Sequence, residues 1–263
     1  EPATIARLLD TSPLRFIDAL SINDAEVTLA RTPDDVLWRG TITTLGLLRR
    51  GSGLEGDASI TFDQQETPGS ATLAVRSDTT TAITNAVLLF NNIRPNTMAP
   101  LAATLAPLAL IDMPLNGTAT AVIGADGALQ SVTVEAASQT GQFALTPALA
   151  KHFGIADAAQ TIPIQSLSLQ VSGQPAVESW TLQSLQLRLP ETAMLSLPAP
   201  VKRSIPLRSI DAQASYDKGR LVVPMLEIAL DGPRLRANAE IADLPGAASG
   251  RLDLQMQDLT VPL

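Results

Sequence analysis

The most recognisable motif of the chain is a glycine pattern near its N-terminus. Gly51-Ser52-Gly53-Leu54-Glu55-Gly56 matches the G-x-G-x-x-G pattern of dinucleotide-binding sites. In such a site the last glycine opens a helix whose N-terminus faces the pyrophosphate. Here residues 57–62 alternate polar and apolar side chains, which is typical of a strand. We therefore interpret the glycines as a turn between two strands and predict no cofactor.

The titratable side chains show no catalytic or metal-binding pattern. His152 is the only histidine, so a three-histidine zinc site is excluded by count, and no G-x-S-x-G nucleophile motif is present. Asp34 and Asp35 form the only adjacent acidic pair. The carboxylates of a glycosidase are defined by their separation in space, so a glycan-acting β protein stays an alternative. We expect a protein that is not an enzyme, with no catalytic residue and no metal site.

Alternation of apolar and polar residues with a period of two dominates the rest of the chain. Side chains alternate between the two faces of a strand, so each such run has one apolar and one polar face. This pattern is typical of antiparallel sheets with one face in water. Counting the runs predicts about 12 to 14 strands. Clear examples are residues 54–62, 166–172, 210–216, 235–241 and 252–257.

Short polar turns separate these runs. Asp126-Gly127, Asp217-Lys218-Gly219 and Asp231-Gly232-Pro233 each lie between alternating segments. Glycine supplies the positive φ that hairpin turns need, and aspartate tolerates it. The apolar parity changes across Val223-Pro224-Met225-Leu226, which predicts a β-bulge or an edge position for the proline. We expect a mostly β fold, a long curled antiparallel sheet that forms a β-groove from repeating hairpins.

Two segments interrupt the alternation and predict short helices lying over or across the sheet. Pro100 to Ile111 places leucines at helical spacing, and Thr146 to Phe153 offers a threonine cap followed by proline. The first segment divides the chain into residues 1–97 and residues 98–263. We expect these to be two groove segments of one continuous sheet.

Composition excludes several classes of protein. The 263 residues carry a net charge of −8, no cysteine and only 3% aromatic side chains, although 45% are hydrophobic. The chain is too apolar for a disordered protein, and the absence of cysteine excludes a disulfide scaffold. The acidic balance argues against nucleic acid as a partner. The longest apolar stretch, Met98 to Ile111, has about 14 residues and two internal prolines, whereas a membrane-spanning helix needs about 20.

The predicted apolar face is aliphatic and smooth. A curled sheet with such a face would hold acyl chains, which bind by dispersion and by exclusion of water. An ordinary sandwich or solenoid with a closed core fits the composition equally well. The residues predicted to line a lipid groove are Ala58, Ile60, Phe62, Leu167, Leu169, Val171, Ala212, Ala214, Ala237, Ala239, Leu252 and Leu254.

Three stretches carry a family resemblance. Ile22 to Leu29 reads I-x-x-A-x-V-x-L, and Leu37-Trp38-Arg39 follows where the next strand would begin. Residues 105–117 contain a short helix-like segment and then Pro114-Leu115-Asn116-Gly117. Gly232-Pro233-Arg234-Leu235-Arg236-Ala237 opens a later strand. Together they resemble the AsmA-like superfamily of Gram-negative envelope proteins, in particular its YhdP-type, TamB-related branch.

This resemblance implies a bridge-like lipid transfer protein. Such proteins have an inner-membrane helix at the N-terminus and a long periplasmic β-groove that conducts phospholipid toward the outer membrane. The chain would be an interior fragment of the groove, with its anchor and other membrane contacts outside the fragment. The implied partners are phospholipid acyl chains, together with unidentified inner- or outer-membrane proteins. The alternative function is a non-enzymatic envelope scaffold with a closed core.

Overall fold

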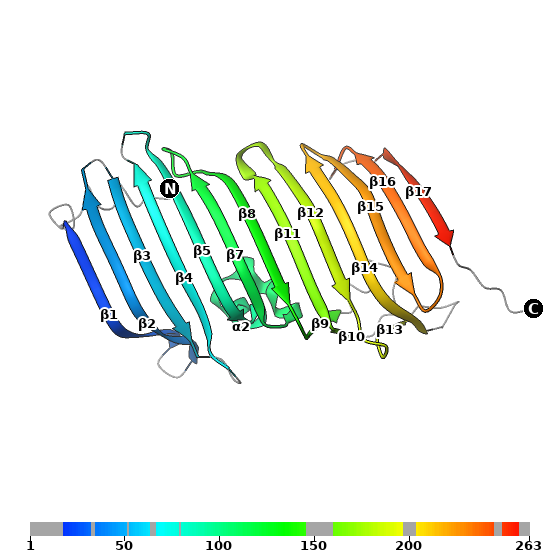
Figure 1. Cartoon of the computed structure of the whole chain (residues 1–263), viewed down its shortest axis with the longest axis horizontal. Coiled ribbons are helices and arrows are strands. Elements are labelled where there is room, and N and C mark those ends of the chain that lie inside the picture. Colours follow the sequence, from blue (N-terminus) through cyan, green and yellow to red (C-terminus); the bar gives the residue numbers. More distant parts are fainter. Residues whose placement is uncertain are drawn as a thin grey trace, which may run out of the picture. The chain divides into compact units, whose positions relative to one another are not determined.

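The computed structural model describes residues 18–32, 35–51, 53–63, 67–78, 80–145, 160–196, 204–244 and 249–257. The fold is mostly β, as predicted (Figure 1). The strands are β1 (Ala19–Thr32), β2 (Asp35–Arg50), β3 (Gly53–Phe62), β4 (Gly69–Asp78), β5 (Ile83–Ile93), β6 (Ile111–Asp112), β7 (Leu115–Ile123), β8 (Leu129–Ser138), β9 (Gly141–Leu145), β10 (Gln160–Ile164), β11 (Ser166–Gln174), β12 (Ser179–Arg188), β13 (Met194–Ser196), β14 (Ser204–Asp217), β15 (Arg220–Leu230), β16 (Arg234–Ala242) and β17 (Ser249–Gln257). The helical elements are α2 (Pro95–Met98), η2 (Ala99–Leu101), η3 (Ala103–Leu110) and η4 (Pro175–Val177).

The strands form two sheets. The larger one has 14 strands in the order β1-β2-β3-β4-β5-β7-β8-β11-β12-β14-β15-β16-β17, with β13 paired to β14. The smaller one has three strands in the order β10-β9-β6. Strands that follow one another in sequence are neighbours almost throughout, because most connections are short and return the chain directly alongside itself. The predicted antiparallel sheet of repeating hairpins is confirmed.

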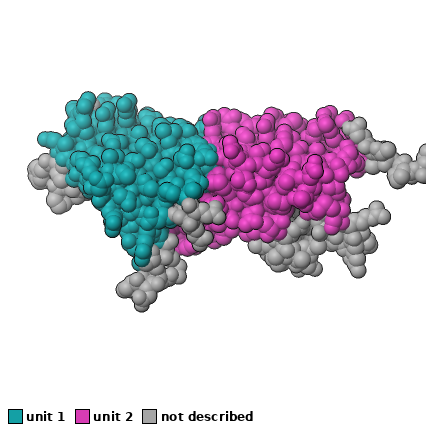
Figure 2. Space-filling model, turned by 60° about the horizontal axis from the view of Figure 1, so that its bottom comes forward, with its two compact units in different colours: residues 1–93, 115–134, 173–176 teal, residues 94–114, 135–172, 177–263 magenta. Residues whose placement is uncertain are grey.

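The chain divides into two compact units, which Figure 2 colours separately. Unit 1 comprises Glu1–Ile93, Leu115–Val134 and Gly173–Ala176, and unit 2 comprises Arg94–Pro114, Glu135–Ser172 and Val177–Leu263. Unit 1 therefore holds β1 to β5 and β7. Unit 2 holds β12 to β17 and the whole of the small sheet.

The hairpin turns lie where glycine and aspartate predicted them. β2 ends at Arg50 and β3 begins at Gly53, so the G-x-G-x-x-G motif is a hairpin connection followed by a strand. Gly51 has φ +56°, in the left-handed region that favours glycine. Lys218 and Gly219, between β14 and β15, have φ +44° and +87°. Positive φ at both central residues is the geometry of a type I′ turn, which matches the twist of the flanking strands.

β-Bulges shift the apolar pattern from one parity to the other. The register of β15 changes between Val223 and Leu226, which confirms the bulge predicted around Pro224. In unit 1 the register of β2 against β3 changes between Ile42 and Thr44. Each extra residue turns the side chains beyond it to the opposite face of the sheet. The apolar side chains before and after the bulge therefore share one face, although the alternation in the sequence changes parity there.

The predicted helix over Pro100 to Ile111 is present only as short turns. α2 has four residues, η2 three and η3 eight, and β6 begins at Ile111. Pro107 lies inside η3. Proline has no backbone N–H and clashes with the preceding turn, which prevents a regular α-helix here. The predicted helix from Thr146 to Phe153 lies outside the described residues.

A cluster of buried hydrophobic residues lies in unit 2. Leu189, Ala193 and Leu207 are buried there at 0 to 6% exposure. Ile162 of β10 packs against this cluster together with the half-buried side chains Leu187, Ile210, Ile228 and Leu230. The small sheet therefore contributes to the core of unit 2. Over the described ranges, no helix combines the length and apolarity needed to span a bilayer.

Candidate apolar binding face

The candidate site of unit 1 is the apolar face of β1 to β4, built from rows of side chains that lie opposite one another. Leu20 on β1 pairs with Leu47 on β2, and Leu47 pairs with Gly56 on β3. Gly56 in turn pairs with Val75 on β4. Directly opposed residues of antiparallel strands point to the same face, so these four positions form one continuous row.

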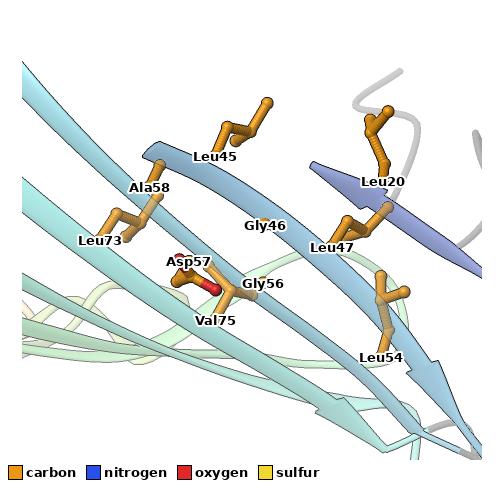
Figure 3. A pocket seen from close by; sticks show the side chains of 10 residues that line it. All are labelled: Leu20, Leu45, Gly46, Leu47, Leu54, Gly56, Asp57, Ala58, Leu73 and Val75. Carbon is orange, nitrogen blue, oxygen red and sulfur yellow. The ribbon is translucent and has the colours of Figure 1, made fainter. Parts of the chain in front are cut away.

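A neighbouring row contains Leu45, Ala58 and Leu73, which are also directly opposed. The two rows enclose an open pocket of about 200 Å³. Figure 3 shows its leucine side chains projecting over the strands. The lining residues are Leu20, Leu45, Gly46, Leu47, Leu54, Gly56, Asp57, Ala58, Leu73 and Val75.

The pocket offers almost nothing to a polar ligand. Asp57 is the only charged residue in the lining. It pairs with Gly46 and Ala74, so it belongs to the row that faces the other side of the sheet. Leu73 is 36% exposed, which means that water reaches this face in the described structure. An aliphatic, water-exposed surface binds hydrocarbon, because contact with a hydrocarbon removes apolar area from water.

Glycine makes room in the pocket. A β-carbon built on Gly56 would lie 3.5 Å from Leu47 Cδ1, which is an ordinary van der Waals contact. No backbone atom therefore blocks this position, and the missing side chain leaves space above the strand. The space between Leu47 and Val75 is available for this reason.

The candidate face of unit 2 has the same construction on β14 to β17. Ala212 pairs with Leu226, Leu226 with Ala237, and Ala237 with Leu254. Val223 pairs with Ala239, and Ala239 with Leu252, in the next row of the same face. The exposed fraction rises along these rows toward β17.

Packing closes one part of this face and leaves another open. Ala212 is 9% exposed, whereas Leu252 and Leu254 on β17 are 61% and 56% exposed. Met256 on the same face of β17 is 56% exposed. Contiguous exposed apolar side chains on a strand mark an interaction surface. The part near β17 is thus the accessible part of the face.

The structure places the residues predicted from the sequence in three groups. Ala58, Ile60 and Phe62 share one face of β3, and Ala58 lines the pocket. Ala212, Ala214, Ala237, Ala239, Leu252 and Leu254 share the apolar face of β14 to β17. Leu167, Leu169 and Val171 occupy alternate positions of β11 and are half-buried.

One of these positions, Phe62, differs from the others in its surroundings. Phe62 is 9% exposed, and its ring meets Trp38 edge-on with centroids 5.4 Å apart. It therefore packs within the protein instead of lining open space. Six aliphatic residues of the pocket wall were not predicted from the sequence, although their alternation was available as a signal: Leu20, Leu45, Leu47, Leu54, Leu73 and Val75.

The opposite face of β12 to β16 carries charge pairs. The Arg188 guanidinium donates to Asp211 at 2.8 Å, and Arg236 donates to Glu227 at 2.8 Å. Asp211 lies directly opposite Glu227, so these two arginines relieve a repulsion between like charges. This arrangement keeps the charged face in water and distinguishes the two sides of the sheet.

A polar cluster connects the two ends of the segment from Arg94 to Asp112. Arg94 Nη1 donates to Asp112 Oδ1 at 2.8 Å, and Gln142 Nε2 donates to Asp112 Oδ2 at 2.9 Å. The Gln142 hydrogen bond, followed by the hydrogen bond and charge of Arg94, lowers the pKa of Asp112 against the opposing effect of burial. The cluster thus holds an ionised carboxylate between α2 and the small sheet.

Two chemistry-bearing residues weighed from the sequence, His152 and Asp34, lie outside the described residues. Within the described part of the chain, no group of three or more His, Cys, Asp or Glu side chains is placed to hold a metal ion.

Comparison with known proteins adds no assignment. No protein-family model, curated protein or solved structure matches the chain. The class defined by the fold is a mostly β protein with a large antiparallel sheet.

Proposed function

We propose that the apolar face binds the acyl chains of phospholipids. The observation that carries this proposal is the open pocket between β1 and β4, whose lining contains a single charged residue. Acyl chains make no hydrogen bonds, so their binding requires only apolar area and exclusion of water. Leucine, valine, alanine and glycine supply such a surface without specific polar partners.

The size of the pocket limits how much of an acyl chain it would bind. Its volume of about 200 Å³ is below the roughly 300–1,000 Å³ of typical small-molecule sites. The pocket would hold part of an acyl chain, and the remainder would lie along the exposed rows of the same face. A shallow, extended contact of this kind suits a surface along which a lipid moves, because no single position binds it tightly.

The proposed activity is passive transfer of phospholipid between the inner and outer membranes of a Gram-negative envelope. The chain would act as a periplasmic segment of an AsmA-like protein, anchored to the inner membrane by a segment outside this sequence. The resemblance of Ile22 to Leu29 and of Gly232 to Ala237 to that superfamily supports this placement. Transfer by sliding needs no catalytic residue, metal or cofactor.

The packed cluster around Leu207 favours a second candidate, a non-enzymatic envelope scaffold or β-solenoid with a closed core. In that case the aliphatic side chains would serve only to stabilise the sheet. The scaffold makes no use of the open pocket beside Gly56.

Lipid extraction and a transfer assay separate the two candidates. The purified 263-residue chain should carry phospholipid detectable by mass spectrometry. It should also accelerate movement of a fluorescent phosphatidylethanolamine from donor to acceptor vesicles of phosphatidylethanolamine and phosphatidylglycerol. A chain that neither carries lipid nor binds a fluorescent fatty acid overturns the lipid proposal and leaves the scaffold.

A further inference from the structure

The apolar face of unit 1 ends in a partly polar row beside the hairpin between β2 and β3. Arg49, the penultimate residue of β2, lies directly opposite Leu54, which lines the pocket. Leu54 lies opposite Ser77 on β4, and Ser77 lies opposite Thr84 on β5. Directly opposed residues of antiparallel strands point to the same face. We call the row from Arg49 to Thr84 the end row, and it shares the face of the pocket.

The end row carries hydrogen-bond donors that suit an anion. The guanidinium of Arg49 is permanently charged and has five N–H donors, so it can bind an anion in addition to other partners. Thr84 Oγ1 donates to Ser77 Oγ at 3.0 Å, which leaves the proton of the Ser77 hydroxyl to donate elsewhere. Glu55, the neighbour of Leu54, pairs with Leu48 and points to the other face. From β2 to β5, the described end row therefore contains a cation and hydroxyls but no carboxylate.

Aromatic side chains close the opposite end of the same face. Gly40 on β2, Phe62 on β3 and Gly69 on β4 are directly opposed, and all three are buried. The ring of Trp38 lies over Gly40, because a β-carbon built there would be 2.8 Å from Trp38 Cζ2. The same ring meets Phe62 edge-on. The face is thus open at the pocket and closed at this aromatic end.

The distance between the two ends matches the length of an acyl chain. Phe62 lies six residues after Gly56 on β3, which corresponds to about 20 Å at about 3.3 Å per residue. A bilayer core of about 30 Å contains two layers of acyl chains, so each chain spans about 15 Å. Ile42, Ile60 and Ala71 form a half-buried apolar row between the pocket and the aromatic end. One acyl chain therefore fits along β3 over these rows.

We propose that unit 1 binds an acidic lipid in one orientation, with its anionic headgroup at Arg49 and Ser77 and its acyl tail directed toward Phe62. A headgroup needs water and hydrogen-bond donors, whereas a tail needs only apolar area. Water reaches the pocket end, where Leu73 is 36% exposed, but Phe62 at the aromatic end is 9% exposed. This inference rests on the proposed lipid binding and adds the class of headgroup and the orientation of the lipid.

Fluorescence titration with cis-parinaric acid and with its methyl ester tests the headgroup contact. The two probes have the same tail, and only the acid is negatively charged at neutral pH. The unmodified chain should bind the acid more tightly than the ester. Arg49→Gln should weaken binding of the acid about fivefold and leave the ester unchanged, since the side chain is half-buried and the exposed Asp18 lies beside it. Arg50→Gln is the matched control, because Arg50 pairs with Gly53 on the opposite face, and it should change neither affinity.

The outcomes separate the headgroup assignment from lipid binding itself. If the unmodified chain binds acid and ester equally, or if Arg49→Gln binds the acid normally, the headgroup assignment is overturned while lipid binding stands. A chain that binds neither probe overturns both proposals. An excess of inorganic phosphate should not displace the acid, because phosphate has no tail to bury. Displacement would indicate a site for free anions and would overturn the headgroup assignment.

Ala71→Leu tests the direction of the tail. It enlarges a side chain between the pocket and Phe62, where a long tail lies and a short tail does not reach. Calorimetric titration should show about threefold weaker binding of cis-parinaric acid and unchanged binding of octanoic acid. Ser70→Leu, on the opposite face of β4, is the matched control and should affect neither acid. An equal loss for both acids, or no loss for either, overturns the orientation.

Discussion

Filling the pocket of unit 1 gives the sharpest test of the lipid proposal. Gly56→Leu places a leucine side chain in the space between Leu47 and Val75. The added β-carbon lies 3.5 Å from Leu47 Cδ1 and 3.6 Å from the Gly46 carbonyl oxygen, which are ordinary van der Waals contacts. We expect the substitution to reduce the volume available to a ligand, and equal thermal stability of the variant checks that β3 stays in place.

The magnitude follows from the hydrocarbon that the new side chain displaces. A leucine side chain has four carbons and takes the place of about four methylenes, each stabilised by about 0.8 kcal/mol when buried. The pocket is open, as the 36% exposure of Leu73 shows. Counting about half of the full value gives roughly 1.5 kcal/mol, or about a tenfold loss of affinity.

A fluorescent fatty acid such as cis-parinaric acid measures this affinity, because its emission rises in an apolar environment. Gly53→Leu is the matched control. Gly53 lies on the opposite face of β3, and its added β-carbon would be 3.4 Å from the Arg50 carbonyl oxygen. We expect Gly56→Leu to weaken binding and Gly53→Leu to leave it unchanged. Equal affinities in the two variants, with equal thermal stability, would refute the assignment of the pocket.

Three further predictions concern stability and are checked by urea unfolding. Leu207→Ala should lower the free energy of unfolding by about 2–4 kcal/mol, because this side chain is only 6% exposed. Leu252→Ala, at a 61% exposed position, should lower it by less than about 1 kcal/mol. Equal losses in the two variants would contradict the difference in burial. Gly141→Ala should cost about 1–3 kcal/mol, because its β-carbon would overlap the β-carbon of the buried Met113; an unchanged midpoint would contradict this packing. Asp112→Asn should cost about 1 kcal/mol at pH 7. The lowered pKa of Asp112 means that its contribution is present above the ordinary value of 3.8 and is lost as pH falls through the folded-state pKa. The two proteins should therefore converge in acid, and a difference that persists at low pH would contradict the role of the ionised carboxylate.

The strands and turns could be predicted because they depend on neighbouring residues. The alternation from Leu54 to Phe62 and from Leu235 to Ile241 matches β3 and β16 within about one residue at each end. Glycine at position 51 and the Lys218-Gly219 pair adopt the positive φ that hairpin turns require. The structure of the segment from Pro100 to Ile111 was harder to predict, because its leucine spacing favours a helix whereas Pro107 interrupts the hydrogen bonds of a helix.

The alternation of this chain by itself determined which side chains share a face of each strand. It did not determine how open that face is. Phe62 and Leu252 both lie on the apolar face of a strand with alternating side chains. Phe62 nevertheless packs against Trp38, whereas Leu252 is 61% exposed. The tertiary structure decided this difference, because burial depends on which distant segments pack against a strand. It also decided the strand register that brings Leu20, Leu47, Gly56 and Val75 into one row, since bulges and pairings across the sheet set that register.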